Sequence, residues 1–156
     1  MSRRLCLILL LCSGAWAQTQ HPRPEGDPGY DQKADPAADL RKAVEQAARE
    51  GKNVLMDVGG EWCSWCHRMD KFFVDNPELL ALRRQNYVFL KAHFSDEHPN
   101  EAFLGKLPKI EGYPHLFVFD AKGKLLQSQN TSDLEAGKSY DLQKFMAFLK
   151  KWAPEK

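Results

Sequence analysis

Cysteine is scarce in this sequence, and neither sign of charge is in excess. The 156-residue chain has four cysteines, and its 22 basic side chains nearly balance 21 acidic ones, for a formal net charge of +1. A nucleic-acid-binding protein usually carries a basic excess or stripe, so this balance argues against that class of partner. At this length the chain is expected to form one domain with a core of its own.

The N-terminus has the pattern of an export signal. Two arginines precede an apolar run that is far shorter than the ~20 residues a membrane-spanning helix needs. Ala15-Trp16-Ala17 then supplies the small residues that signal peptidase reads. We expect residues 1–17 to be a signal peptide cleaved after Ala17, with no membrane insertion afterwards. Lipoprotein anchoring at Cys12 is disfavoured because the bulky Leu11 precedes that cysteine.

Cleavage would leave two cysteines, Cys63 and Cys66, in a chain delivered to an oxidising compartment. Small secreted domains that depend on disulfides carry several pairs, which close long loops. A bond across two intervening residues closes almost no loop and therefore contributes little chain entropy. We expect the pair to serve chemistry rather than stability.

The rest of the chain divides into an arm and a domain. Proline and glycine gather in residues 18–35, which predicts a flexible, loosely packed arm, and residues 36–156 form the domain. Helices are expected over 36–50, 63–74, 77–84, 101–105 and 142–152, and strands over 53–58, 87–94, 115–120 and 124–128. This order predicts an α/β fold, with a mixed central β-sheet flanked by helices on both faces.

Cys63 and Cys66 stand where the first strand gives way to a helix. Unpaired N–H groups and the positive dipole end of a helix stabilise a thiolate. They lower the pKa of a cysteine from about 8.5 to roughly 3.5–7.5. The second cysteine lies one turn further on, within reach of a mixed disulfide on the first. The pattern predicts Cys63 as nucleophile and Cys66 as resolving thiol, and it requires no cofactor.

Two segments carry a resemblance to a known family. Val54 to Cys66 resembles the active-site segment of the thioredoxin-like superfamily, and Glu111 to His115 is similar to its cis-proline loop. The resemblance covers about residues 36–153 and implies the thioredoxin fold. It also implies that Asp57, six residues before Cys63, is a buried carboxylate that accepts the proton of Cys66.

The resemblance assigns further residues to the site. It implies that Pro114 is cis, so that backbone groups of Tyr113 pair with a substrate segment, and that Trp62 and Trp65 form a docking patch. The alternative, in which a tryptophan folds back into the core, suits Trp62 better than Trp65. Lys91 matches a family lysine that faces the aspartate, and an ordinary exposed lysine is an equal interpretation.

The motif Trp-Cys-x-Trp-Cys-His-x-Met, from Trp62 to Met69, resembles a subgroup that includes DUF255-type domains and small exported bacterial proteins. The chain is therefore expected to be a periplasmic thiol–disulfide oxidoreductase, either a disulfide reductase or an interchange protein. Its expected partners are protein or small-molecule disulfides and a membrane-bound thiol reductant. The physiological substrate, the direction of electron flow and the oligomeric state do not follow from the sequence.

Three alternatives remain. Cys63, Cys66 and His67 satisfy the pattern for covalent c-type haem attachment, but a cytochrome would need neither the strand with Asp57 nor the Gly-Tyr-Pro loop. A zinc site that adds His93 or His98 matches no familiar tetrahedral spacing, so no metal site is expected. The third alternative is a binding module that keeps the fold without turnover.

Overall fold

The computed structural model describes residues 21–155 of the chain. The expected signal peptide, its cleavage site after Ala17, Cys12 and the start of the arm lie outside the described residues. Between residues 21 and 155, none of the helices is long and apolar enough to cross a membrane.

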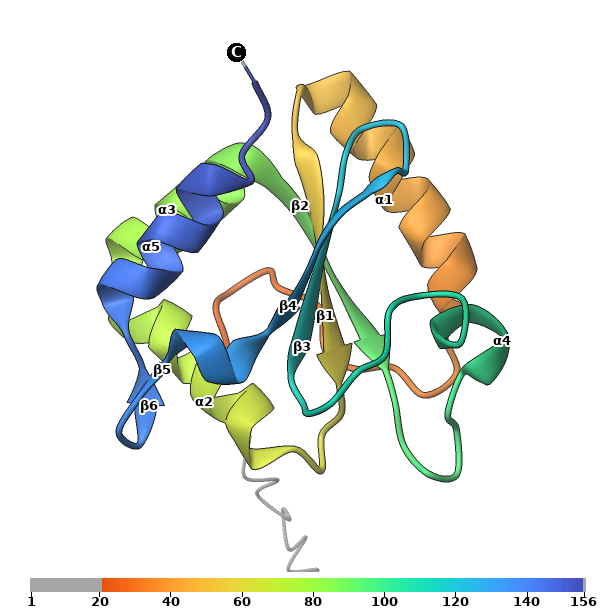
Figure 1. Cartoon of the computed structure of the whole chain (residues 1–156), viewed down its shortest axis with the longest axis horizontal. Coiled ribbons are helices and arrows are strands. Elements are labelled where there is room, and N and C mark those ends of the chain that lie inside the picture. Colours follow the sequence, from red (N-terminus) through yellow and green to blue (C-terminus); the bar gives the residue numbers. More distant parts are fainter. Residues whose placement is uncertain (1–20, 156) are drawn as a thin grey trace, which may run out of the picture.

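A four-stranded sheet forms the centre of the molecule, with the strand order β2-β1-β3-β4 (Figure 1). The strands are β1 (Asn53–Gly59), β2 (Tyr87–His93), β3 (His115–Phe119) and β4 (Leu125–Asn130). β1 pairs with β2 in parallel and with β3 antiparallel, and β4 completes an antiparallel pair with β3. The predicted mixed sheet is therefore confirmed.

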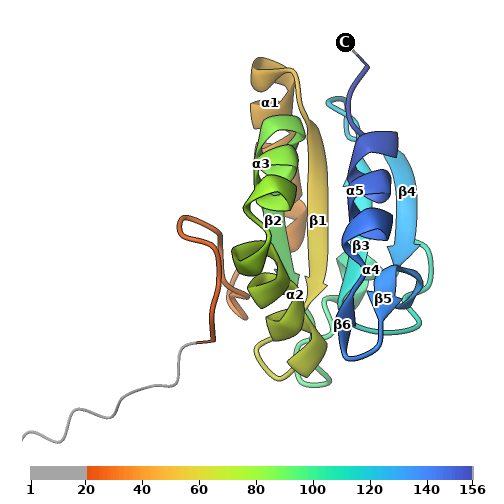
Figure 2. The ribbon, with the colours of Figure 1, turned by 90° about the vertical axis from the view of Figure 1, so that its left-hand side faces the viewer.

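Helices cover both faces of this sheet. They are α1 (Pro36–Glu50), α2 (Ser64–Asp75), α3 (Pro77–Asn86), α4 (Glu101–Leu104) and α5 (Leu142–Lys151). Buried side chains of α2, α3 and α5 pack with Leu55 on one face, which Figure 2 views from the front. α1 and α4 pack with Val54 and Met56 on the other face. The predicted fold class is confirmed.

β1 is an interior strand of the sheet and is buried along its whole length. All seven of its residues are buried, because a strand in the middle of the sheet has helices against both of its faces. Alternate side chains of a strand point to opposite faces of the sheet. The Asp57 side chain therefore lies on the same face as Leu55, the face that α2 covers. The only charged residue of β1 is thus placed under the helix that begins at the cysteine pair.

The segment before α1 differs from the expectation of a loosely packed arm. In its described part, residues 21–35, the Tyr30 side chain is buried and Asp27 forms a buried ion pair with Arg83 on α3. Arg84 adds a second contact to the same carboxylate at 3.6 Å. Proline and glycine content indicates an irregular path, but it does not reveal side chains that fasten such a path to the domain.

Part of the C-terminal half has structure that the sequence did not predict. A 3₁₀ turn, Thr131–Leu134, leads into a small hairpin of β5 (Glu135–Ala136) and β6 (Ser139–Tyr140). Strands of two residues are too short to show a hydrophobic period, and the turn between them contains Gly137 with a φ of +60°. This hairpin lies between β4 and α5 in the chain.

A substitution in the Asp27–Arg83 pair tests whether residues 21–35 are docked on the domain. The Arg83 side chain is 1% exposed, so Asp27→Asn leaves a buried guanidinium without its counter-charge. We expect a loss of roughly 3 kcal/mol in the free energy of unfolding, measured with urea at neutral pH. As a control, Asp75→Asn breaks the exposed Lys71–Asp75 pair and is expected to cost less than about 0.5 kcal/mol. Equal losses in the two variants would contradict a docked segment.

Candidate active site

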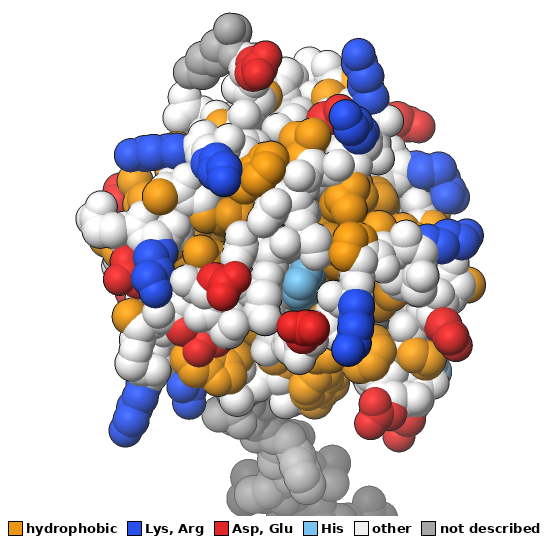
Figure 3. All heavy atoms as spheres, in the orientation of Figure 1, with side chains coloured by type: hydrophobic (Ala, Val, Ile, Leu, Met, Phe, Trp, Pro, Cys, Tyr) orange, Lys and Arg blue, Asp and Glu red, His pale blue; other side chains and the backbone are white. Residues whose placement is uncertain are grey.

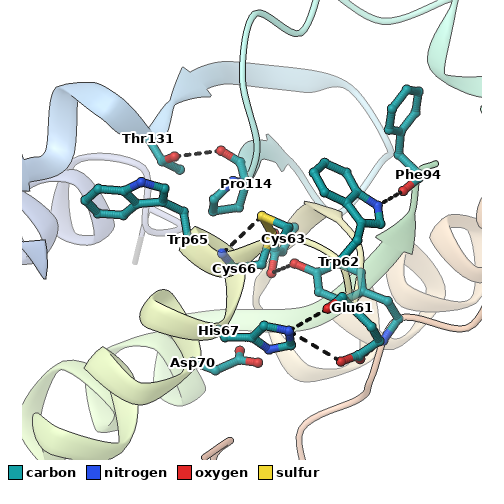
Figure 4. Close-up of a disulfide and its surroundings, with 12 residues drawn as sticks. Glu61, Trp62, Cys63, Trp65, Cys66, His67, Asp70, Phe94, Pro114 and Thr131 are labelled. Atoms are coloured by element: carbon teal, nitrogen blue, oxygen red, sulfur yellow. Dashed lines mark hydrogen bonds and ion pairs between the residues drawn. A yellow bond between two sulfur atoms is a disulfide. The ribbon is translucent and has the colours of Figure 1, made fainter. Parts of the chain in front are cut away.

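Cys63 and Cys66 form a disulfide at the N-terminus of α2 (Figure 4). Cys63 is the N-cap residue, and its Sγ accepts a hydrogen bond from the backbone N–H of Cys66 at 3.1 Å. Cys63 keeps 4% of its surface exposed, whereas Cys66 is fully buried. Of the two cysteines, Cys63 therefore lies nearer the surface and Cys66 deeper in the domain.

Asp57 lies beneath α2 in a buried cluster of charged groups. The register of β1 and β2 places it opposite Lys91, whose Nζ is 4.0 Å from Asp57 Oδ2. The same Nζ donates to both carboxylate oxygens of Asp70 on α2, at 2.6 and 2.7 Å. Lys91 is buried, so the interpretation of it as an exposed lysine does not hold.

Tyr30 completes this cluster from the segment before α1. Its hydroxyl donates a hydrogen bond of 2.7 Å to Asp57 Oδ2, and its side chain belongs to one buried cluster with Cys63 and Cys66. Lys91 Nζ lies 4.5 Å from the centre of the same ring. The second oxygen of Asp57, Oδ1, is buried and has no hydrogen-bond partner within residues 21–155.

Burial dominates the protonation of the two carboxylates. It raises the pKa of Asp57 from 3.8 to about 6, against the opposing effects of Lys91 and of the Tyr30 hydrogen bond. Burial also raises the pKa of Asp70, opposed by the charge and hydrogen bonds of Lys91. A carboxyl group with a pKa near neutrality can take up and release a proton under ordinary conditions, as a proton acceptor must.

The two tryptophans lie on either side of the disulfide (Figure 4). Trp62 is 55% exposed, its indole N–H donates to the carbonyl oxygen of Phe94 at 2.7 Å, and its ring meets Tyr113 edge-on. Trp65 is half-buried and packs against Tyr140. Trp65, rather than Trp62, is thus the one that turns toward the core, because the first turn of α2 carries its side chain toward β6.

The loop before β3 reaches the same end of the molecule. The Tyr113–Pro114 peptide bond is cis, and Figure 4 shows Pro114 facing the cysteine pair. Thr131 Oγ1 donates a hydrogen bond of 2.6 Å to the carbonyl oxygen of Pro114, which fixes the loop from the side of β4. The ring of Tyr113 stacks on Phe94 with their centres 4.6 Å apart.

A hollow of about 380 Å³ opens beside this aromatic group. Trp62, Phe94, Ser95, Asp96, Glu97 and Tyr113 line it. Figure 3 shows apolar side chains, with acidic ones beside them, at this lower end of the molecule. The surface next to the disulfide is thus apolar on its floor and acidic along part of its rim.

A family model described as thioredoxin-like matches residues 35–121, more than half of the chain. The chain belongs to the thioredoxin-like family. Its cysteine pair, its cis proline and its buried aspartate all lie within the matched residues.

Relatives of this thioredoxin-like chain include two thiol:disulfide interchange proteins named DsbD. That of Klebsiella pneumoniae subsp. pneumoniae is 26% identical over 157 residues, which cover 96% of this chain and 25% of the relative. That of Colwellia psychrerythraea is 32% identical over 97 residues, which cover 61% of this chain and 16% of the relative. The chain thus spans a quarter or less of the length of these relatives.

Two solved structures share the fold of this thioredoxin-like domain. A disulphide isomerase from Xylella fastidiosa Temecula1 has a TM-score of 0.67 and 24% identity, covering 78% of this chain and 94% of that one. The oxidised C-terminal domain of DsbD from Neisseria meningitidis has a TM-score of 0.54 and 20% identity, covering 80% and 97%. At these identities the likeness supports the fold alone.

The surroundings of His67 bear on the haem and zinc alternatives. Its Nε2 makes a hydrogen bond of 2.7 Å with the carbonyl oxygen of Glu61, and its ring stacks on His21 with centres 3.8 Å apart. This contact ties the first turn of α2 to the preceding loop. In the part of the chain that the structure describes, no three His, Cys, Asp or Glu side chains are arranged to hold a metal ion.

Sequence reasoning did not single out Tyr30, Asp70 or Thr131. Asp70 carries a usable signal, because it lies on the same side of α2 as the buried Met69 and Phe73, where an acidic residue interrupts an apolar stripe. Tyr30 carries none, because it stands among prolines and glycines and its partner lies 27 residues away.

The raised pKa of Asp57 predicts a pH dependence of stability. The folded protein holds this proton more tightly than the unfolded chain, so the stabilisation is complete below about pH 4 and is lost as the pH rises through about 6. The difference between 3.8 and about 6 corresponds to about 3 kcal/mol.

Asp57→Asn removes this titration. The oxidised variant is expected to match the oxidised wild type near pH 4 and to exceed its free energy of unfolding by up to about 3 kcal/mol above about pH 7. Urea unfolding of both proteins at the two pH values measures the difference. A difference that is the same at both would contradict the assignment of the titration to Asp57.

Proposed function

We propose that this chain is a periplasmic thiol–disulfide oxidoreductase, acting as a disulfide reductase or interchange protein. The observation that carries the proposal is the Cys63–Cys66 disulfide at a helix N-terminus, packed against the Tyr30–Asp57 pair. The names of its DsbD relatives, which are thiol:disulfide interchange proteins, support the same chemistry. Export follows from the signal peptide expected in residues 1–17, with cleavage after Ala17.

The first step belongs to Cys63. In the reduced protein its thiolate attacks one sulfur of a substrate disulfide, the substrate S–S bond breaks, and the second substrate sulfur leaves as a thiolate. The product is a mixed disulfide on Cys63. The backbone N–H of Cys66, 3.1 Å from Cys63 Sγ, and the other free N–H groups at the start of α2 stabilise the attacking thiolate.

The second step belongs to Cys66 and Asp57. Asp57 accepts the proton of Cys66, and the resulting thiolate attacks Cys63 Sγ in the mixed disulfide. The bond to the substrate breaks, its sulfur leaves as a second thiolate, and the Cys63–Cys66 disulfide forms. The substrate gains two electrons and finally two protons. A membrane-bound thiol reductant then supplies two electrons to restore the dithiol.

Substrate binding is assigned to the aromatic surface around Cys63. Trp62 offers an exposed apolar contact and Tyr113 a half-buried one beside the hollow of about 380 Å³, and Trp65 bounds the other side of the cysteine pair. Backbone groups of Tyr113, next to Pro114, lie within reach of an extended segment that carries the substrate disulfide. The acidic rim formed by Asp96 and Glu97 favours segments with a basic residue near the disulfide.

Two cysteine variants test the mechanism. Cys63→Ser removes the nucleophile and is expected to abolish reduction of insulin disulfides, followed as precipitation of the reduced chains. Cys66→Ser keeps the first step and is expected to accumulate a mixed disulfide with the substrate, seen by mass spectrometry without reductant.

Activity of Cys63→Ser near that of the wild type would overturn the mechanism. A wild-type pair that alkylation shows never to cycle between dithiol and disulfide would instead favour a binding module without turnover.

Trp62→Ala tests the docking surface. Loss of this exposed aromatic contact is expected to raise KM for a protein disulfide about tenfold. It should leave the rate with a small-molecule disulfide unchanged, because the cysteines keep their environment. Val74→Ala is the matched control, since Val74 is also an exposed large apolar residue, 41% accessible, but stands near the far end of α2. Similar KM values for the two variants would contradict the assignment.

A further inference from the structure

Tyr30 is the one group in the buried cluster that comes from outside the sheet and its helices. It is 7% exposed, and its side chain forms a buried group with Cys63 and Cys66. Its hydroxyl donates to Asp57 Oδ2 at 2.7 Å. The residue thus contacts both the cysteine pair and the carboxylate assigned to proton transfer.

The side chains of Tyr30 and Cys66 both lie next to Gly59. A β-carbon at Gly59 would lie 2.5 Å from Cys66 Sγ and 2.9 Å from the Tyr30 hydroxyl oxygen. Both atoms therefore border the same small space at the end of β1, which only a residue without a side chain leaves open. The Tyr30 hydroxyl therefore lies close to Cys66 Sγ as well as to Asp57.

The other charged groups around Asp57 do not duplicate this contact. Lys91 on β2, Asp70 on α2 and Arg83 on α3 all act on its charge through space. Lys91 is at 4.0 Å, and its ammonium is held by both oxygens of Asp70. Within the described residues, Tyr30 therefore supplies the one hydrogen bond that the Asp57 carboxylate accepts.

We propose that Tyr30 is a positioning residue of the resolving step: its hydroxyl holds Asp57 Oδ2, which leaves Oδ1 as the oxygen that takes the proton from Cys66. The inference rests on the proposed thiol–disulfide exchange and adds to it a residue from the N-terminal segment. Because the hydrogen bond favours the charged carboxylate, it also lowers the pKa of Asp57 against the effect of burial. Tyr30 thereby sets the pH above which Cys66 can be deprotonated.

The N-terminal segment that carries Tyr30 is held by its own contacts. Asp27 pairs with the buried Arg83, and the guanidinium of Arg83 lies over the rings of Phe73 and Phe89, at 4.4 and 4.0 Å from their centres. These contacts fix the backbone three residues before Tyr30. The segment is thus a component of the active site rather than a tether.

The test separates the two chemical steps in one experiment. Reduced full-length protein is mixed with dithiobis(nitrobenzoate), which releases one coloured thiolate when Cys63 attacks and a second when Cys66 resolves the mixed disulfide. The rate of the second release is measured from about pH 4.5 to about pH 9. In the wild type it is expected to rise with a midpoint near 6, where Asp57 ionises.

Tyr30→Phe keeps the ring and removes only the hydroxyl. The midpoint of the second release is expected to move up by about one pH unit, which makes this step about tenfold slower below the midpoint. The first release should keep its wild-type rate. Tyr87→Phe is the matched control, because it also removes a buried hydroxyl with a 2.7 Å hydrogen bond, in this case to the carbonyl of Leu149. It should leave the midpoint unchanged.

A second measurement does not depend on turnover. Carbon-13 NMR titration of the Asp57 carboxyl in the oxidised proteins should show the same upward shift in Tyr30→Phe and none in Tyr87→Phe. Wild-type midpoints in Tyr30→Phe by both methods would overturn the inference and leave the exchange mechanism standing. A wild-type protein that shows no second release would overturn the proposed function itself.

Discussion

A carboxylate kept away from water is the constraint on which the rest of this site depends. Asp57 lies on an interior strand whose residues are all buried, and a buried charge without partners is costly. Its compensation comes from separate elements, namely the Lys91 ammonium on β2 and the Tyr30 hydroxyl from the segment before α1. Lys91 is in turn held by Asp70 on α2. Each of these buried polar groups is stabilised by a neighbour from another element, so the cluster forms only in the complete fold.

The helices of the fold begin and end at residues that local sequence patterns predict. Asp35 caps α1 through two backbone N–H groups, Pro36 begins the helix, and Gly51 ends it in the left-handed region. Cys63 caps α2 through one backbone N–H, that of Cys66. Such signals act between residues a few positions apart, so rules of spacing find them. The cysteine pair and its place at a strand-to-helix junction could be predicted for this reason.

The rest of the site depends on contacts between distant parts of the chain, which spacing rules do not reach. The Lys91–Asp70 contact spans 21 residues, and the two carboxylates near Lys91 come from different elements. The half-buried ring of Trp65 packs against Tyr140, which lies 75 residues further along the chain. The place of Lys91 near Asp57 could be predicted only from the family resemblance. The place of Tyr30 could be predicted neither from residue spacing nor from the resemblance.

The enclosure of Arg83 has a consequence for the order of assembly. Its guanidinium is sandwiched by aromatic rings in the body of the domain and is neutralised from a segment far upstream in the chain. The docking of that segment and the burial of the Arg83 charge on α3 therefore depend on each other. The surroundings of Cys66 are complete only when Tyr30, which that segment carries, packs against residues that follow it in the chain. Completion of the redox centre is thereby coupled to completion of the domain.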